Sequence, residues 1–167
     1  GKWWMVDPEG YLFWSHGVVR VTPSTAITPL DGRHSYFEEL PHQESDFEQF
    51  YYTHDELLRP YYADRGFTQT YDFSSANCYR KYGEDYKNVF ADLAHRRLLS
   101  WGLNTIANSS DKDICLMDKT PYVDRIEVRS RPIEGTAGQW LPFMDPYDDS
   151  FVERIESQLL ARSREVN

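Results

Sequence analysis

The 167-residue sequence predicts an α/β fold built from repeating β/α units, and the stretch between residues 85 and 111 indicates it most directly. Residues 85–101 place apolar side chains at helical spacing, so one stripe of a helix can face a core. That stripe consists of Phe90, Leu93, Ala94, Leu98 and Trp101, and Arg97 falls at the same spacing. Gly102 follows where a helix needs a left-handed residue to end, and residues 103–107 predict a short buried strand.

Residues 1–21 predict a β-hairpin followed by the first strand of the main sheet. Asp7-Pro8-Glu9-Gly10 has turn chemistry, because proline presets the second position and glycine tolerates the strained one. Residues 11–14 and 17–21 are rich in β-branched and aromatic side chains, and the second run is the better candidate for the first sheet strand.

Residues 22–84 predict a long insertion between this strand and the helix. Four prolines interrupt any extended element, while short helices are expected near residues 44–52 and 55–62. The segment is too aromatic for disorder, so we expect it to fold over one end of the sheet. Its rings either pack the insertion itself or offer a flat platform for a sugar.

Residues 85–167 form the third region of the chain, after the hairpin and the insertion. Beyond residue 111 its pattern of secondary structure weakens. Residues 122–128 alternate loosely and predict a strand. Asp145 and Pro146 have the residue types of a helix N-cap and first helical position. The apolar stripe that follows predicts a helix reaching about Leu160.

Composition excludes several functions. The formal net charge of −9 argues against nucleic acid or an anionic membrane as the main partner, whereas a neutral ligand such as a sugar is unaffected by it. No apolar run is long enough to span a bilayer. The two cysteines, Cys78 and Cys115, have neither metal-ligand nor disulfide-framework spacing. With no glycine-rich phosphate loop either, no metal or cofactor is expected.

The polar cluster after the buried strand is the main candidate binding site. In repeating α/β folds the loops at the carboxyl ends of strands carry the ligand chemistry. Asn108, Ser109 and Asp111 offer donors and acceptors suited to sugar hydroxyls. The alternative is an Asx or Ser turn that satisfies its own backbone.

His16 and Arg20 flank or lie within the first sheet strand and are the other candidate binding residues. Arg20 could bind a sugar hydroxyl or orient a carboxylate, and the alternative is a structural ion pair. For His16 the alternative is a structural hydrogen bond. His95, Arg96 and Arg97 predict a solvated helix face.

Four segments, residues 4–15, 76–85, 90–106 and 145–148, resemble in order and spacing the bacterial β-agarases of glycoside hydrolase family 50. The resemblance implies a (β/α)8 TIM barrel. A complete barrel needs roughly 250 residues, so residues 1–167 would be the N-terminal portion of a catalytic barrel, with about the first three β/α units. It also implies that the parent protein is secreted or periplasmic in a bacterium.

The resemblance further implies hydrolysis of β-glycosidic bonds in a galactan such as agarose, with a retaining mechanism. Its partners would be a polysaccharide or oligosaccharide and the remainder of the barrel. The two catalytic glutamates of the family follow the fourth and seventh barrel strands, so both are expected outside this chain. Glu127 and Glu134 are the only glutamates near a candidate third strand, and a solvated surface role is expected for both. The alternatives are a non-catalytic carbohydrate-binding module and a structural α/β domain.

Overall fold

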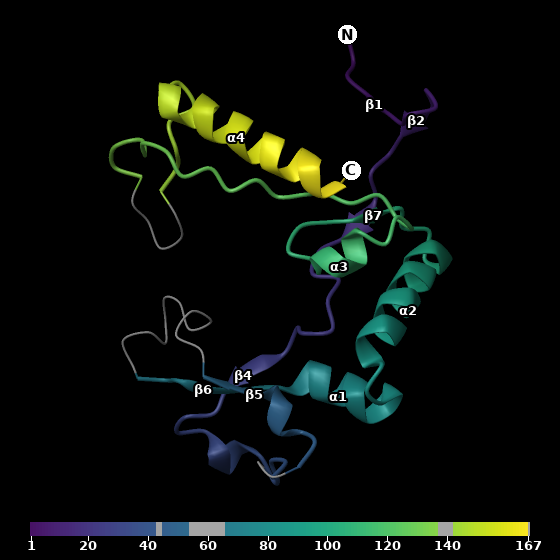
Figure 1. Cartoon of the computed structure of the whole chain (residues 1–167), viewed down its shortest axis with the longest axis vertical. Helices are drawn as coiled ribbons and strands as arrows, with labels where there is room; N and C mark the ends of the chain where they lie inside the picture. Colours follow the sequence, from purple (N-terminus) through teal and green to yellow (C-terminus); the bar gives the residue numbers. More distant parts are fainter. Residues whose placement is uncertain (43–44, 54–65, 137–141, 167) are drawn as a thin grey trace. The chain divides into compact units, whose positions relative to one another are not determined.

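The computed structural model describes residues 1–42, 45–53, 66–136 and 142–166 (Figure 1). The chain divides into two compact units, residues Gly1–Val123 and Asp124–Asn167. In its described residues, the larger unit contains three small sheets and most of the helices. The smaller unit is an irregular segment followed by one long helix.

The N-terminal hairpin forms as the sequence predicts. Strand β1, Met5–Val6, pairs antiparallel with β2, Leu12–Phe13. The Asp7 carbonyl accepts a hydrogen bond from the Gly10 amide at 3.0 Å, and the Asp7 carboxylate accepts one from the Tyr11 amide at 2.8 Å. Gly10 has φ +91°, a conformation that glycine adopts without a steric penalty.

A parallel ladder forms the centre of the larger unit. Strand β3, Gly17–Val18, pairs parallel with β7, Thr105–Ile106, in the register Gly17 to Thr105. The strands approach closely there, since a Cβ on Gly17 would lie 2.6 Å from the carbonyl carbon of Thr105. On its other side, β7 makes a parallel bridge from Ile106 to Tyr122.

The predicted strand over residues 122–128 is therefore wrong beyond its first residues. The Val123 amide donates to the Ile106 carbonyl at 2.9 Å, and the described residues after it have no regular structure as far as Pro132. The ladder stops because β7 itself is only two residues long, and residues 124–129 alternate charged side chains with no apolar face wide enough to bury.

The insertion folds as an antiparallel sheet and a helix. Strands β4 (Ile27–Pro29), β6 (Gln69–Asp72) and β5 (Tyr51–Thr53) lie in the order β4-β6-β5. A 3-10 turn, η1, spans His34–Tyr36. The helix predicted at residues 44–52 is wrong: only a 3-10 turn, η2, forms at Glu48–Phe50, because the following β-prone residues pair with β6. The helix predicted at 55–62 lies outside the described residues.

Two helices complete the connection from β3 to β7. Helix α1, Phe73–Tyr82, was not predicted and lies within the expected insertion. Helix α2, Tyr86–Ser100, matches the predicted helix, and Gly102 ends it at φ +72°. Trp101, however, is 65% exposed rather than in the core, because it caps the helix outside the apolar stripe. A short helix, α3 (Lys112–Cys115), connects β7 to the bridge at Tyr122.

Two apolar cores stabilise the larger unit. Ala91, Ala94 and Leu98 of α2 pack with Val21, Ile106, Ile114 and Cys115 under the parallel ladder. The second core consists of Leu30, Phe50, Tyr71, Ala76 and Tyr86, surrounded by half-buried aromatics of the insertion. Most of the described insertion rings therefore pack against one another, as one of the two alternatives predicted.

The smaller unit contains α4, Asp149–Val166, which begins four residues later than Asp145 and ends beyond Leu160. Asp145 instead accepts from the Tyr147 amide in an Asx turn at 3.0 Å. Asp148 accepts from the Ser150 amide at 3.0 Å at the start of the helix. Among the described residues, no helix has the length and apolar character needed to cross a bilayer.

Candidate functional site

The carboxyl ends of β3 and β7 meet at one edge of the ladder. The Arg20 amide donates to the Asn108 carbonyl at 3.1 Å, and the Asp111 amide donates to the Val21 carbonyl at 2.9 Å. Asn108 and Asp111 therefore lie beside the loop that follows Val21. Parallel pairing requires this arrangement, because both strands run toward the same edge.

A cavity of about 280 Å³ opens at this edge. Its lining brings together two of the residues predicted from the sequence with the loop that enters β4. The lining residues are Arg20, Thr22, Ser24, Thr25, Ile27 and Ser109. A guanidinium and several hydroxyls around a small hollow suit a ligand rich in hydroxyl groups.

Arg20 and Ser109 share an unusual backbone conformation. Arg20 has φ +59° and Ser109 has φ +62°, in the left-handed region that non-glycine residues seldom adopt. Such strain persists only where the surrounding structure fixes it, and it concentrates at functional positions. Here the hydrogen bonds between the two strand ends fix it, and both side chains are held at the cavity.

The other predicted residues have different places. Asp111 caps α3, because its carboxylate accepts from the Asp113 amide at 2.9 Å, so the turn alternative describes its main contact. Asn108 is exposed beside the cavity residues. His16 lies at the amino end of β3, where its backbone pairs with Asn104: its carbonyl accepts from the Asn104 amide and its amide donates to the Asn104 side chain, both at 2.8 Å. The structure therefore does not bring His16 together with the other candidate binding residues, Arg20, Asn108, Ser109 and Asp111.

Ser110 holds the strand ends and was missed by the sequence analysis. Its hydroxyl accepts from the Val21 amide at 3.0 Å and donates to the Ala107 carbonyl at 2.6 Å. The signal was present, because Ser109 and Ser110 follow the same strand, but the sequence alone does not show which of the two hydroxyls lines the cavity.

Asp72 supports the far side of the cavity and was also missed. It is 1% exposed, and its carboxylate accepts from the Ser74 hydroxyl at 2.9 Å and the Ser75 amide at 3.0 Å. Burial raises the pKa of Asp72, but hydrogen bonds from Ser24, Ser75 and Ser74 outweigh it and hold the pKa below its ordinary value. Through Ser74, whose hydroxyl accepts from the Thr25 amide at 2.7 Å, the Asp72 carboxylate helps to hold the cavity residue Thr25 in place. An aspartate just before a helix is a recognisable cap, so this signal could have been found.

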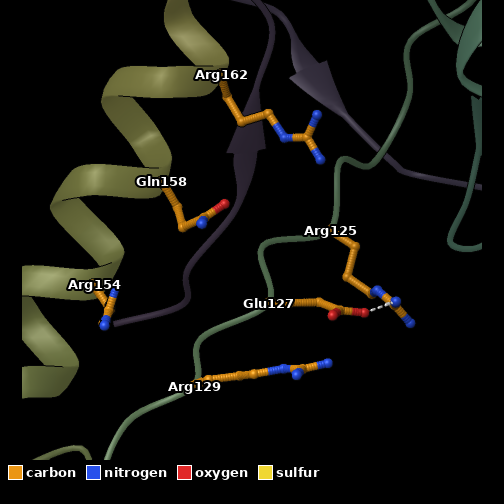
Figure 2. Close-up of a pocket in the computed structure, with 6 residues that line it drawn as sticks. All are labelled: Arg125, Glu127, Arg129, Arg154, Gln158 and Arg162. Atoms are coloured by element: carbon orange, nitrogen blue, oxygen red, sulfur yellow. Dashed lines mark hydrogen bonds and ion pairs between the residues drawn. The ribbon is translucent and has the colours of Figure 1, made fainter.

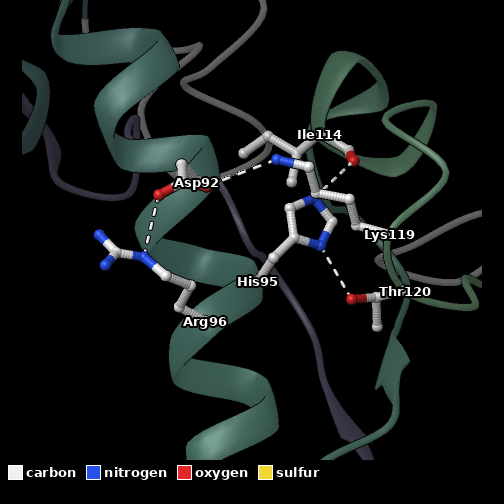
Figure 3. Close-up of polar contacts among 6 residues, drawn as sticks. All are labelled: Asp92, His95, Arg96, Ile114, Lys119 and Thr120. Carbon is white, nitrogen blue, oxygen red and sulfur yellow. Dashed lines mark hydrogen bonds and ion pairs between the residues drawn. The ribbon is translucent and has the colours of Figure 1, made fainter.

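A second polar cluster surrounds His95 on helix α2 (Figure 3). The predicted solvated face is wrong for His95, which is 5% exposed. Its Nε2 lies 3.2 Å from the Ile114 carbonyl, so Nε2 carries the hydrogen, and Nδ1 accepts from the Thr120 hydroxyl at 2.8 Å. Burial of the ring lowers the pKa of His95, although the bond to Ile114 opposes this shift.

This histidine is a structural connection between α2, α3 and the chain before Tyr122. Beside it, Asp92 on α2 pairs with Arg96 at 2.9 Å and Lys119 at 3.4 Å, as Figure 3 shows. Neither ring nitrogen is free to bind a ligand. Among the described residues there is no group of three histidine, cysteine or acidic side chains that could hold a metal ion.

Glu127 and Glu134 are both exposed, and the Glu127 carboxylate pairs with Arg125. Neither lies in the cavity at the ends of β3 and β7. Both locations agree with the surface role expected for these glutamates.

No protein-family model matches the chain. The chain is homologous to two agarases of Vibrio sp. (strain JT0107). It is 27% identical to beta-agarase B over 193 aligned positions covering all of this chain, and 26% identical to beta-agarase A over 170 positions covering 90% of it. The chain spans 20% and 16% of the length of these two relatives.

Solved structures show the same fold. The agarase AgWH50C matches 99% of this chain with a TM-score of 0.77 at 23% identity, and PfGH50B matches 99% with a TM-score of 0.73 at 23% identity. In each case the match covers 26% of the solved chain. The resemblance to β-agarases stated from the sequence is therefore confirmed over the whole chain.

Proposed function

We propose that this chain is the N-terminal portion of a glycoside hydrolase that acts on β-glycosidic bonds of a galactan such as agarose. The observation that carries the proposal is that the chain aligns along its whole length with agarases while its strand ends form a polar cavity. Loops at the carboxyl ends of parallel strands are where barrel enzymes bind their substrates.

The proposed architecture is the first part of a (β/α)8 barrel. Support comes from the parallel order of β3, β7 and the bridge at Tyr122, with helices in each connection. Consecutive parallel neighbours joined through helices are the repeating unit of such barrels. The insertion with β4, β5, β6 and α1 then belongs to the first β-to-α connection.

In this proposal Arg20 and Ser109 bind hydroxyl groups of the sugar. The Arg20 guanidinium can only donate hydrogen bonds, while the Ser109 hydroxyl can donate and accept, so together they match a diol. Asn108 lies next to Ser109 in the sequence and offers its side-chain amide to the sugar. Asp111 and Ser110 instead hold the loop that follows β7. The partners are a polysaccharide and the rest of the barrel.

The catalytic step is proposed to belong to two glutamates outside this chain, with retention of configuration. Retaining glycosidases place two carboxyl groups roughly 5–5.5 Å apart. No acidic side chain among the described residues lines the cavity at the ends of β3 and β7. This chain would supply binding and orientation of the substrate.

Binding is tested by titrating the chain with agarose oligosaccharides. Arg20→Gln and Ser109→Gly should each weaken binding roughly tenfold, since each removes hydrogen bonds to the sugar, and glycine keeps the positive φ of residue 109. Arg96→Gln is the matched control, because Arg96 is an exposed arginine outside the cavity. Equal affinity for all three variants and the wild type would overturn the proposed site.

Catalysis is tested separately. The chain alone should not hydrolyse agarose or aryl β-galactosides, whereas a longer protein that contains it should, and proton NMR should show first a product anomer of unchanged configuration. Turnover by the chain alone that disappears in Glu127→Gln or Glu134→Gln would contradict the assignment of the catalytic residues. Binding without turnover in the longer protein would favour the carbohydrate-binding module.

A further inference from the structure

The smaller unit contains a cavity of about 510 Å³ lined by four arginines (Figure 2). It lies between the irregular segment after Asp124 and helix α4. The lining residues are Arg125, Glu127, Arg129, Arg154, Gln158 and Arg162. None of them belongs to the cavity at the ends of β3 and β7.

Two sequence periodicities build this arginine cavity. Residues 125, 127 and 129 are spaced by two, so an extended segment directs them to one side. Residues 154, 158 and 162 are spaced by four, so they form one row along α4. Figure 2 shows the two rows on facing elements, and an ion pair from Arg162 to Asp124 at 3.2 Å connects them.

The charges of the cavity are not balanced. Glu127 pairs with Arg125, and Asp124 pairs with Arg162. Arg129 and Arg154 have no acidic partner within ion-pair distance in the part of the chain that the structure describes. Two unpaired guanidinium groups therefore line one cavity from opposite sides, in a chain whose net charge is −9.

Guanidinium groups select planar or tetrahedral oxyanions, because their donors form a rigid fork that matches two oxygens at once. Gln158 and Glu127 add a donor and acceptors suited to neighbouring hydroxyls. The acidic balance of the chain disfavours a nucleic acid, whose long run of phosphates would be repelled outside the cavity. A single anionic group on a hydroxyl-rich carrier molecule fits both the size of the arginine cavity and its positive charge.

We propose that the arginine cavity binds a sulfate ester or carboxylate group of a charged polysaccharide, through Arg129 and Arg154. The choice of a polysaccharide as carrier rests on the proposed function, whereas the oxyanion site rests on the cavity alone. The site would let a galactan-degrading protein hold substrate chains that carry acidic substituents.

The test compares three probes by titration calorimetry: sulfated galactan oligosaccharides, neutral agarose oligosaccharides and inorganic sulfate. The wild-type chain should bind the sulfated oligosaccharides more tightly than either other probe. Arg129→Gln and Arg154→Gln should each weaken that binding roughly 10- to 100-fold, the range expected for a lost charge-assisted hydrogen bond. Thermal unfolding of each variant checks that it folds, and these exposed substitutions should leave the transition in place.

Arg164→Gln is the matched control, since Arg164 lies on the same helix, is exposed and does not line the cavity. Equal loss of binding in this control, or no loss in Arg129→Gln and Arg154→Gln, would overturn the site. The choice of a polysaccharide as carrier would be overturned if inorganic sulfate bound as tightly as the sulfated oligosaccharide. It would also be overturned if a single-stranded oligonucleotide bound that tightly. Failure of the Arg20 and Ser109 variants to affect neutral oligosaccharides would contradict the proposed function but leave these outcomes intact.

Discussion

Two neighbouring tyrosines of the insertion differ in one hydrogen bond. Their rings lie 4.6 Å apart between centroids. The Tyr51 hydroxyl donates to the Pro41 carbonyl at 2.7 Å. The Tyr71 hydroxyl is buried and has no partner within the described residues, and burial is the main reason that the pKa of Tyr71 rises to about 12. A buried polar group without a partner costs free energy that a phenyl ring would not.

We therefore expect Tyr71→Phe to raise the free energy of unfolding by roughly 1 kcal/mol and Tyr51→Phe to lower it by about the same amount. Urea unfolding of both variants measures the difference. The two substitutions remove the same atom from rings in contact, so each is a control for the other. A lower stability of Tyr71→Phe would show that its hydroxyl has a partner.

His95 predicts a dependence of stability on pH. Because burial lowers its pKa, the folded chain holds it neutral, while the unfolded chain binds a proton below the ordinary value of 6.5. The stabilisation is complete above that value and is lost as the pH falls through it toward the lower pKa of the folded state. Urea unfolding at several pH values between 8 and 5 should show this loss.

The control for this prediction is the exposed His16. His95→Leu should be less stable at pH 8 but should have a flatter pH profile between 8 and 5, whereas His16→Gln should keep the wild-type slope. A wild-type stability that does not change over this range would contradict the assignment of a neutral buried ring.

At the scale of the residue, the sequence indicates where the candidate site lies better than it indicates which contacts each residue makes there. The end of a buried strand predicted the positions of Asn108, Ser109 and Asp111 correctly, because parallel strands must place their carboxyl ends together. The roles of Ser110 and Asp72 depend on contacts with residues about 90 and 50 positions away, such as Val21 and Thr25 through Ser74. Local patterns place Ser110 after a strand and Asp72 before a helix, but they contain no signal for these long-range contacts.

Among the elements, α2 could be predicted because it has a complete local pattern, an apolar stripe and then a glycine stop. Strand β7 could be predicted because a short apolar run follows that glycine. Helix α1 has a polar sequence without a clear apolar stripe, so the cap at Asp72 was the one local signal for it, and it lay inside the expected insertion. Tyr51–Thr53 became a strand because β6 pairs with it, and pairing partners are not visible in a local window.

Helix α1 supplies a prediction at this scale. Asp72 caps it through the Ser75 amide, and the same carboxylate holds Ser74, whose hydroxyl accepts from the amides of Thr25 and Ala26 at 2.7 and 3.0 Å. We expect Asp72→Ala to lower the free energy of unfolding by at least about 2 kcal/mol, the upper end of the range for a helix cap, because buried partners also lose their bonds.

The matched control is Asp85→Ala. Asp85 occupies the N-cap position of α2 but makes no capping hydrogen bond, so its substitution should cost clearly less. The Asp72 effect should also fade in acid, because a lowered pKa stabilises the fold above the ordinary value of 3.8 and that contribution disappears as the pH falls below it. Equal costs for both variants at pH 7 would contradict the capping argument.

At the scale of the whole molecule, large apolar side chains remain exposed on the larger unit. Leu99 is 81% exposed and Trp101 is 65% exposed at the end of α2, and Trp14 is also exposed. In the proposed barrel, these surfaces and the edges of the short parallel ladder are where further β/α units would pack.

We therefore expect the isolated chain to associate in solution as its concentration rises, which light scattering together with thermal unfolding would measure. Leu99→Gln with Trp101→Gln should reduce association while changing the free energy of unfolding by only about 0.5 kcal/mol per site, because neither side chain is buried. Leu98→Ala, which removes a buried side chain of the same helix, should instead cost roughly 2–5 kcal/mol. A monodisperse monomer with a sharp transition would mean that the chain is stable without further units, and a stand-alone carbohydrate-binding module would then explain it better than part of a barrel.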